Sequence, residues 1–234
     1  MKAMILAAGR GERMRPLTDS TPKPLLQAGG KPLIVWHLQR LKQAGIDEIV
    51  INHAWLGQQI EDTLGDGSAY GVHLSYSAEG AQGLETAGGI ATALPFLGDK
   101  PFLVVNGDVF TDIDFQAAQN IAQTLPENQL AYLWLVPNPE HHPNGDFSLQ
   151  HNGLILSEST TGQRGTFSGV GIYRPELFTD IAPRSIAKLA PLLRQAMQNQ
   201  QISGAFHQGL WLDVGTPERL QQAHQLAQQG KLAA

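Results

Sequence analysis

The 234-residue sequence contains no cysteine. This absence excludes disulfides, zinc–thiolate sites and thiol nucleophiles, and it suits a reducing compartment. The sequence also lacks any apolar run that approaches the roughly 20 residues of a membrane span, and the run in MKAMILAAG is too short for a signal peptide. We therefore expect a soluble, cytoplasmic protein with no membrane partner.

The sequence has no excess of basic residues either. Lys and Arg number 16 against 21 Asp and Glu, giving a formal net charge of −5. Proteins that bind nucleic acid usually carry a basic domain or stripe, so nucleic acid is not an expected partner. The basic residues gather instead in LAAGRGERMRPLTDSTPKPLL, residues 6–26. Because surface loops rarely combine such rigid and such basic chemistry, we expect an anionic ligand there.

The order of apolar runs and helical patterns predicts an α/β fold. Strands are expected in AMILAA, EIVINHA, VHLSYSA, PFLVVNGD and LAYLWLVP, and helices in PLIVWHLQRLKQAG, LGQQIEDTL, TAGGIATALPFL and DFQAAQNIAQTL. Strands that alternate with helices of this length indicate βαβ units and a mostly parallel, mixed central sheet flanked by helices. The length and the 42% hydrophobic content fit one large domain, so we expect a single Rossmann-like domain over residues 1–234.

The pattern changes after Pro137, which divides the domain into halves at residues 1–137 and 138–234. The segment DFSLQHNGLILSE predicts a hairpin that turns at Asn152-Gly153. A strand in FSGVGIY, a helix in SIAKLAPLLRQAMQNQ, a strand in GLWLDV and a closing helix from Pro217 follow. No hexapeptide array follows the last helix, so we expect no added β-helix domain.

Residues with useful chemistry follow several predicted strands, where open α/β sheets bind their ligands. Gly9 and Gly11 would let the backbone approach a phosphate, and Arg13 can make a bidentate contact. Lys23 is a point charge stiffened by a proline on each side. Taken alone, the glycine-rich turn could be structural, because GRGER lacks both the dinucleotide fingerprint and the G-K-[ST] of a P-loop.

Asp108 and Asp213 also come at strand ends. A single aspartate there is commonly a cap or turn residue, but two would offer the hard oxygen ligands that Mg²⁺ prefers. The sequence contains no convincing Ser–His–Asp set. A reaction at this edge would therefore depend on positioning and charge neutralisation.

The segments LAAGRGERMRPLTDSTPKPLL, NGDVFTD and WLDVGTPE together resemble the sugar-1-phosphate nucleotidyltransferases. These enzymes join a nucleoside triphosphate to a sugar 1-phosphate and release pyrophosphate, and the similarity covers nearly the whole chain. The resemblance implies a GT-A-like fold, Lys23 and Arg13 as catalytic residues, and Mg²⁺ held by Asp108 and Asp213. Many members have threonine where Glu12 stands, so we expect Glu12 to face solvent or to pair with an arginine.

The same resemblance implies that the first half binds the nucleotide and the second half the sugar. The implied nucleotide contacts are Ala8, Gly9, Gly11, Glu12, Arg13, Lys23, Glu79, Gln82 and Gly83. Glu79 or Gln82, with the backbone at Gly83, would read the base. The implied sugar contacts are Asn106, Gly145, Asp146, Glu158 and Gly169, although Gly145 is equally well explained as a simple turn.

Within the family, ETAGG, NGDVFTDIDF, HHPNGDFSL and WLDVGTPERL are most similar to bacterial members that use UTP and N-acetylmuramic acid α-1-phosphate in cell-wall recycling. A guanylyltransferase for mannose 1-phosphate, or another hexose or heptose enzyme, is an alternative on the same frame. A nucleotide-sugar-dependent glycosyltransferase is an alternative from another class, but it has no evident need for the Arg13 loop with Lys23. A non-catalytic nucleotide sensor would have little reason to keep both aspartates.

N-acetylmuramic acid carries a lactyl ether with a carboxylate at its 3-position. We expect the space for this group to lie under the segment from residue 138 to 174. His141, His142, Arg164 and Arg174 are the candidate cationic neighbours there. We expect a monomer or a weak homo-oligomer.

Overall fold

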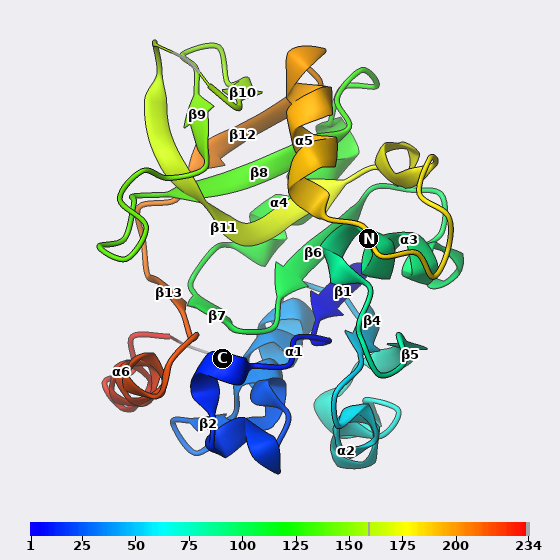
Figure 1. Ribbon diagram of the computed structural model, residues 1–234, viewed down its shortest axis with the longest axis vertical. Coiled ribbons are helices and arrows are strands. Elements are labelled where there is room, and N and C mark those ends of the chain that lie inside the picture. The colour runs from blue at the N-terminus through cyan, green and yellow to red at the C-terminus, as the bar shows by residue number, and fades with distance from the viewer. Residues whose placement is uncertain (159, 233–234) are drawn as a thin grey trace.

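The computed structural model describes residues 1–158 and 160–232. One part of its central sheet consists of parallel strands in the order β6-β1-β4-β5 (Figure 1). Their bounds are Ala3–Leu6 for β1, Glu48–His53 for β4, His73–Ala78 for β5 and Phe102–Asn106 for β6. Each of these strands was predicted from its apolar run, so the βαβ interpretation of this half is confirmed.

Alternate residues of the parallel strands face opposite sides of the sheet. In β1, Ala3 and Ile5 belong to one apolar cluster, and Met4 belongs to another. In β4, Ile51 joins the first cluster and Val50 the second. Such strands are buried on both faces, as a parallel sheet covered by helices requires.

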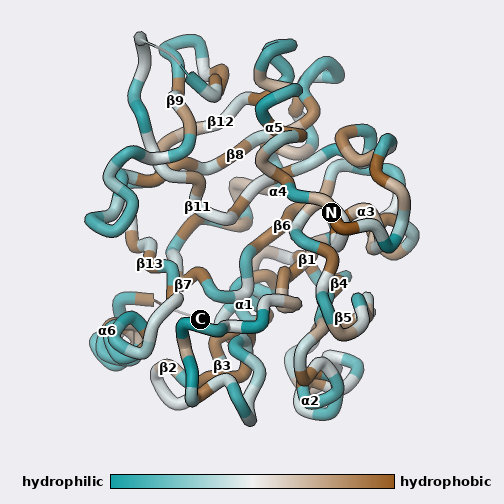
Figure 2. The backbone as a smooth tube through the Cα atoms, in the orientation of Figure 1, coloured by the Kyte–Doolittle hydropathy of each residue, from teal (hydrophilic) through white to brown (hydrophobic). Residues whose placement is uncertain are grey.

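Helices cover both faces of the sheet (Figure 1). The cluster of Ala3 and Ile5 takes side chains from α1, α2 and α4, and the cluster of Met4 takes them from α3 and α5. The bounds are Leu33–Gln43 for α1, Gly57–Leu64 for α2, Glu85–Leu97 for α3, Phe115–Thr124 for α4, Leu189–Gln198 for α5 and Pro217–Gln228 for α6. Figure 2 shows hydrophobic residues gathered in the central strands and a largely hydrophilic α6 at the edge. Across the described residues, no helix has the length and apolar character needed to span a membrane.

The second half continues the same sheet with mixed strand directions. β11 runs antiparallel to β6, β8 and β9, and β12 pairs parallel with β8. β9 and β10 form the hairpin predicted at Asn152-Gly153. The bounds are Ala131–Val136 for β8, Phe147–Leu149 for β9, Ile155–Leu156 for β10, Gln163–Tyr173 for β11 and Ile202–Phe206 for β12. The expected fold class, a single α/β domain with a mixed central sheet flanked by helices, is confirmed.

Short elements connect the larger ones. Two small ladders join β2 to β3 and β7 to β13. Their bounds are Gln27–Ala28 for β2, Lys31–Pro32 for β3, Val109–Thr111 for β7 and Trp211–Asp213 for β13. Single 3₁₀ turns span Glu12–Met14, Leu17–Asp19, Lys23–Leu25, Ser68–Tyr70 and Pro175–Phe178.

The structure differs from the sequence prediction at two places in the second half. The predicted helix from residue 185 begins only at Leu189, because the backbone of Ala187 is bonded elsewhere. The Ala187 N–H donates to the Leu84 carbonyl, and the Ala187 carbonyl accepts from the N–H groups of Ala87 and Gly88. Strand β12 was not predicted, because its sequence ISGAF is short and holds only two strong strand-forming residues.

Candidate active site

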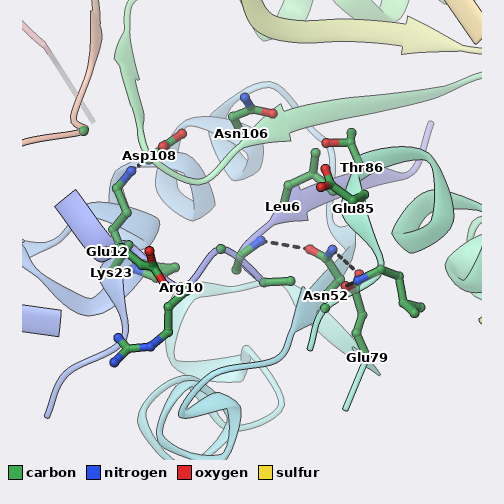
Figure 3. A pocket seen from close by; sticks show the side chains of 18 of the residues that line it. Leu6, Arg10, Glu12, Lys23, Asn52, Glu79, Glu85, Thr86, Asn106 and Asp108 are labelled. Carbon is green, nitrogen blue, oxygen red and sulfur yellow. Dashed lines mark hydrogen bonds and ion pairs between the residues drawn. The ribbon is translucent and has the colours of Figure 1, made fainter. Parts of the chain in front are cut away.

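A cleft of about 600 Å³ opens at the carboxyl ends of β1, β4, β5 and β6 (Figure 3). This is the edge at which open α/β sheets bind their ligands. Its lining consists of residues 6–13, Lys23, Pro24, Asn52, Glu79, residues 82–86, Asn106, Asp108 and Gly215. Segments far apart in the sequence therefore meet around one space large enough for a nucleotide.

Most of the residues predicted from the sequence lie on this cleft. The lining includes every predicted nucleotide contact, namely Ala8, Gly9, Gly11, Glu12, Arg13, Lys23, Glu79, Gln82 and Gly83. It also includes Asn106 and Asp108. The other predicted sugar contacts and Asp213 are not among the lining residues within the described part of the chain.

The loop after β1 has the backbone conformation and the space that an anion site needs. Gly11 has a φ of +70°, and a Cβ added there would lie 3.0 Å from Thr18 Cγ2 and 3.3 Å from Lys23 Cβ. The Thr18 hydroxyl donates to the Gly11 carbonyl at 2.8 Å, which holds the turn. At Gly9 an added Cβ would meet nothing within 4 Å, so the backbone there faces open space. Glycine is therefore needed at Gly11 to form the turn, and Gly9 leaves the approach clear.

The three arginines of this loop have different environments. The Arg10 guanidinium stacks 3.8 Å from the centre of the Trp55 ring and donates to the Thr18 carbonyl, so it anchors the loop to the start of α2. Arg13 instead reaches Gly215, where an added Cβ would lie 3.0 Å from Arg13 Nη2. Arg15 pairs with Asp19 on the surface at 2.7 Å. Arg10 and Arg13 thus both line the cleft, and Arg13 extends toward Gly215.

Glu12 is exposed at the rim of the cleft, as expected for an acidic residue beside an anion site. Lys23 is only 9% exposed, and its Nζ contacts Asp108 Oδ2 at 2.5 Å. The lysine lies in the 3₁₀ turn between Pro22 and Leu26, whereas Asp108 lies in the turn between β6 and β7. The ion pair therefore joins the basic loop to the end of the sheet (Figure 3).

The ladder of β7 and β13 brings the two predicted metal ligands together. Asp213 lies opposite Val109, and the Val214 N–H donates to the Asp108 carbonyl at 2.7 Å. The Asp213 carboxylate contacts Arg219 Nη1 at 2.5 Å and His141 Nε2 at 3.3 Å. Among the described residues, no three His, Cys, Asp or Glu side chains form a group that could hold a metal ion.

Both aspartates are thus neutralised by cations of the chain itself. Asp108 directly precedes β7 and Asp213 ends β13, so two carboxylate residues lie on adjacent backbone segments and would offer Mg²⁺ hard oxygen ligands, which substrate phosphates and water would complete. Arg219 was missed by the sequence analysis. It lies in the first turn of α6, whose N-cap is Thr216, and its side chain returns to an aspartate six residues earlier.

Asn52 and Glu79 form the opposite wall of the cleft (Figure 3). Asn52 Nδ2 donates to Glu79 Oε1 at 2.6 Å, and Glu79 Oε2 accepts from the Leu84 N–H at 2.7 Å. Burial raises the pKa of the Glu79 carboxyl, and the hydrogen bonds from Asn52 and Leu84 oppose that shift. Gln82 is exposed at the rim, and Gly83 has a φ of +68°. Asn52 was also missed by the sequence analysis, although a polar residue near the end of a buried strand is a usable signal.

The remaining predicted sugar contacts lie around β9 and β11. The Asp146 carboxylate contacts His142 Nε2 at 3.1 Å and accepts from the Phe167 N–H at 2.8 Å. Gly145 forms a tight turn, since an added Cβ would lie 2.3 Å from Asn138 Oδ1. Gly169 has a φ of +78°, and an added Cβ would lie 2.6 Å from Asn106 Nδ2.

The structure also places the last predicted sugar contact and the candidate cationic neighbours of the second half. Glu158, the sugar contact, is exposed beside the β10 strand. Arg164 donates to the carbonyls of Asn144 and Ser157, so it holds the loop before β9. Arg174 donates to the carbonyls of Leu125 and Gln129 and is not among the cleft residues of the described chain. His141, next to Asp213, is the candidate closest to the predicted metal ligands.

The fold and the cleft together define the class: an α/β protein with a nucleotide-sized cleft at the carboxyl edge of its sheet, lined by a glycine-rich basic loop and a lysine–aspartate ion pair. Residues 2–230 match the family described as Nucleotidyl transferase, and the chain belongs to this family. It is 68% identical over 227 residues to the N-acetylmuramate alpha-1-phosphate uridylyltransferase of Neisseria meningitidis, covering 97% of this chain and 98% of that one. It is 35% identical to the protein of the same name from Caulobacter vibrioides, with 92% of each chain covered.

Solved structures agree on the fold. A putative glucose-1-phosphate thymidylyltransferase from Bacillus anthracis superposes with a TM-score of 0.82 at 24% identity, covering 97% of this chain and 95% of that one. HddC from Yersinia pseudotuberculosis superposes with a TM-score of 0.75 at 20% identity, covering 96% and 98%. At these identities the similarity establishes the fold. The resemblance proposed from the motifs is confirmed by the family match.

Proposed function

We propose that the chain transfers a uridylyl group from UTP to N-acetylmuramate α-1-phosphate, giving UDP-N-acetylmuramate and pyrophosphate. The observation that carries this proposal is the 68% identity, over nearly the full length of both chains, to a relative that bears this activity in its name. The cleft supports it, because its glycine-rich basic loop and its Lys23–Asp108 ion pair suit the transfer of a nucleotidyl group between anions.

The first half, residues 1–137, holds the triphosphate in this proposal. The backbone from Ala8 to Gly11 approaches the phosphates, and Arg13 contacts them from the side of the cleft near Gly215. Gln82, with the backbone at Gly83, recognises uracil, because both carboxylate oxygens of Glu79, the other candidate, are bonded to Asn52 and the Leu84 N–H. Uracil presents an N3–H donor between two carbonyl acceptors, so one acceptor and one N–H from this segment are enough to read it.

Lys23 acts on the reacting phosphates. Its ammonium is paired with Asp108 in the structure, and the triphosphate, which carries several negative charges, offers a competing partner. Once it is paired with the phosphates, a cation at the point where charge develops stabilises the transition state. Mg²⁺, held by Asp108 and Asp213, would supply further charge neutralisation at the triphosphate.

The sugar phosphate itself is the nucleophile. A phosphomonoester loses its second proton near pH 6, so the attacking oxygen is already anionic at neutral pH and needs no general base. The chain's contribution is to align the two anions for in-line attack on the α-phosphorus and to neutralise their repulsion. No side chain of the protein forms a covalent intermediate in this scheme.

The second half, residues 138–234, holds the sugar. Its proposed contacts are Gly145, Asp146, Glu158 and Gly169, together with Asn106 from the first half. Asn106 and Gly169 are adjacent across the β6–β11 pair, which links the sugar side to the reacting end. We place the reaction in the recycling of peptidoglycan, in the cytoplasm, by a monomer or weak homo-oligomer.

The test is a matrix of UTP, GTP, dTTP and CTP against N-acetylmuramate, N-acetylglucosamine and mannose 1-phosphates, with released pyrophosphate as readout. We expect the highest kcat/KM for UTP with N-acetylmuramate 1-phosphate, and no release after Mg²⁺ is chelated. A preference for GTP with mannose 1-phosphate would replace the substrate assignment and keep the reaction class. Sugar transfer from a nucleotide sugar without pyrophosphate release would reject the reaction class itself.

A further inference from the structure

A chain of buried hydrogen bonds joins the ends of β1, β4 and β5 (Figure 3). The Ala7 N–H donates to Asn52 Oδ1 at 2.8 Å, and Asn52 Nδ2 donates to Glu79 Oε1 at 2.6 Å. Glu79 Oε2 accepts from the Leu84 N–H at 2.7 Å. Asn52 and Glu79 are only 3% and 6% exposed, so these bonds are protected from water.

The two ends of this chain of hydrogen bonds belong to two different ligand-binding segments. Ala7 immediately precedes the backbone at residues 8–11, which approaches the triphosphate in the proposed function. Leu84 is the N-cap of α3 and immediately follows Gln82 and Gly83, which lie at the rim where the base is read. The Asn52–Glu79 pair is therefore the direct side-chain link between these two segments.

We propose that Asn52 and Glu79 are positioning residues that fix the spacing between the triphosphate loop and the base-reading segment. The inference rests on the proposed nucleotide binding in this cleft. A nucleoside triphosphate must contact both segments at once, so an error in their spacing weakens binding without removing any contact group. Asn52 reaches the ligand only through its partners.

The direction of each hydrogen bond is set by the backbone. The N–H groups of Ala7 and Leu84 can only donate, so Asn52 must accept with its carbonyl oxygen and Glu79 must accept at Leu84. The Asn52 amide nitrogen then has to donate to Glu79, and the ionised carboxylate completes the chain of hydrogen bonds. An amide at position 52 and a carboxylate at position 79 are thus a complementary pair.

Helix α3 holds the pair in place. A Cβ added at Gly89 would lie 2.3 Å from Glu79 Oε1 and 2.9 Å from Asn52 Nδ2. The backbone of α3 therefore lies directly against both polar groups. This close contact explains why the helix carries glycine at that position, where alanine would favour the helix.

Exchanging the amide at position 52 and the carboxylate at position 79 tests the proposal. Asn52→Asp places a second carboxylate against Glu79 and removes the donor between them. Glu79→Gln leaves one acceptor oxygen for two donors, Asn52 Nδ2 and the Leu84 N–H, so one of these hydrogen bonds is lost. The double variant Asn52→Asp/Glu79→Gln restores every bond: the new carboxylate accepts from the Ala7 N–H and from the new amide nitrogen, while the new amide oxygen accepts from the Leu84 N–H. The net charge of the double variant equals that of the wild type.

We expect each single variant to raise the Kd for UTP and its KM about tenfold, which is about 1.4 kcal/mol of binding free energy, because the ligand must then restore the spacing that the broken hydrogen bond had fixed. We expect kcat to change less than about threefold, and the double variant to return to within about threefold of the wild-type Kd. Gln58→Glu is the matched control, because it also sets a carboxylate beside another, Asp62, but on the surface of α2. Its Kd should equal that of the wild type.

Thermal unfolding of every variant separates positioning from a purely structural role. Single variants that lose stability but keep the wild-type Kd would contradict the proposal, and so would a double variant that binds as weakly as the weaker single one. A wild-type chain that binds no nucleoside triphosphate would reject the proposed function and this role together. Wild-type binding with unaffected variants rejects the positioning role alone.

Discussion

The two walls of the cleft differ in the kind of interaction that holds each one in place. The wall at β4 and β5 consists of nearly inaccessible hydrogen bonds between Asn52, Glu79 and the backbone. The opposite wall carries the Lys23–Asp108 ion pair, and the Asp213–Arg219 pair adjoins it along the β7–β13 ladder. The aspartates of both pairs remain partly exposed, with 35% of the Asp108 side chain and 24% of the Asp213 side chain accessible. Buried hydrogen bonds are expensive to break, whereas partly exposed ion pairs exchange partners at little cost. The first wall is therefore preformed, and the second can release its cations to incoming phosphates.

The largest expected effect comes from removing a cation of the exchangeable wall. Lys23→Met keeps most of the side chain and deletes the charge. Loss of one charge contact to the reacting phosphates should lower kcat roughly 10²- to 10³-fold. Steady-state kinetics with pyrophosphate release measure this. Lys42→Met, which removes an exposed ion pair with Asp47, is the control and should behave as the wild type; equal kcat values for the two variants would exclude Lys23 from the reacting centre.

The next effect comes from the carboxylates of the same wall. Asp108→Asn and Asp213→Asn should each reduce turnover about a hundredfold, because a weaker Mg²⁺ site loses several kcal/mol of transition-state stabilisation. Titration with Mn²⁺, followed by its paramagnetic effect on water relaxation, should show weaker metal binding in both variants. Asp99→Asn, at an exposed position after α3, is the control. Unchanged metal affinity in both cleft variants would contradict the assignment.

A smaller effect is expected at the preformed wall. Gly89→Ala inserts a Cβ against Glu79 and should raise the KM for UTP about tenfold with little change in kcat. Gly88→Ala is the matched comparison on the same helix turn, because its Cβ would meet the Ser185 carbonyl at 2.0 Å instead. That variant should lose thermal stability and keep its KM. Identical behaviour of the two variants would contradict the specific role of the Asn52–Glu79 pair.

The smallest effect on turnover is expected from His37, which is buried in α1, because its titration changes the stability of the fold. Burial, together with a smaller contribution from the charge of Arg40, lowers its pKa from 6.5 to about 4, while Asp108 and a hydrogen bond with Val109 act in the opposite direction. The folded protein therefore stays neutral at His37 while the unfolded chain takes up a proton. Stability should fall by roughly 3 kcal/mol as the pH drops from about 6.5 to about 4. Above pH 6.5 the group contributes no pH dependence.

Urea unfolding between pH 4 and pH 8 measures this loss. His37→Gln should show a flatter profile over that range, whereas His151→Gln, at an exposed position, should follow the wild type. A His37→Gln profile as steep as the wild-type profile would mean that other groups cause the pH dependence.

The parallel half of the fold was predictable because its signals are local. Strands such as β4 are short apolar runs, and helices such as α1 have their own apolar period; α1 also has a proline at its start. The second half depends more on distant contacts. Residues 185–188 were predicted as helical, but the backbone of Ala187 is bonded to Leu84 and α3 instead. No local pattern in the sequence could reveal that pairing.

The residues of the candidate site also divide into those that local motifs predict and those that depend on distant contacts. Gly11, Lys23 and Asp108 stand in dense motifs, where unusual residue types at short spacing point to anions and metal. Asn52 and Arg219 stand in ordinary strand and helix patterns and gain their roles only from partners elsewhere in the fold. Asn52 bonds to groups 45 and 27 residues away, and Arg219 turns back from its helix toward Asp213 and His141.

The central claim is direct transfer between two bound anions, with no covalent intermediate on the protein. It is tested most directly by the stereochemistry at the α-phosphorus, using UTP that carries one defined α-thiophosphate configuration. A single in-line displacement inverts that configuration in the nucleotide-sugar product, and inversion is the predicted result. Retention would require two displacements, hence a nucleotidylated side chain, and would contradict the account.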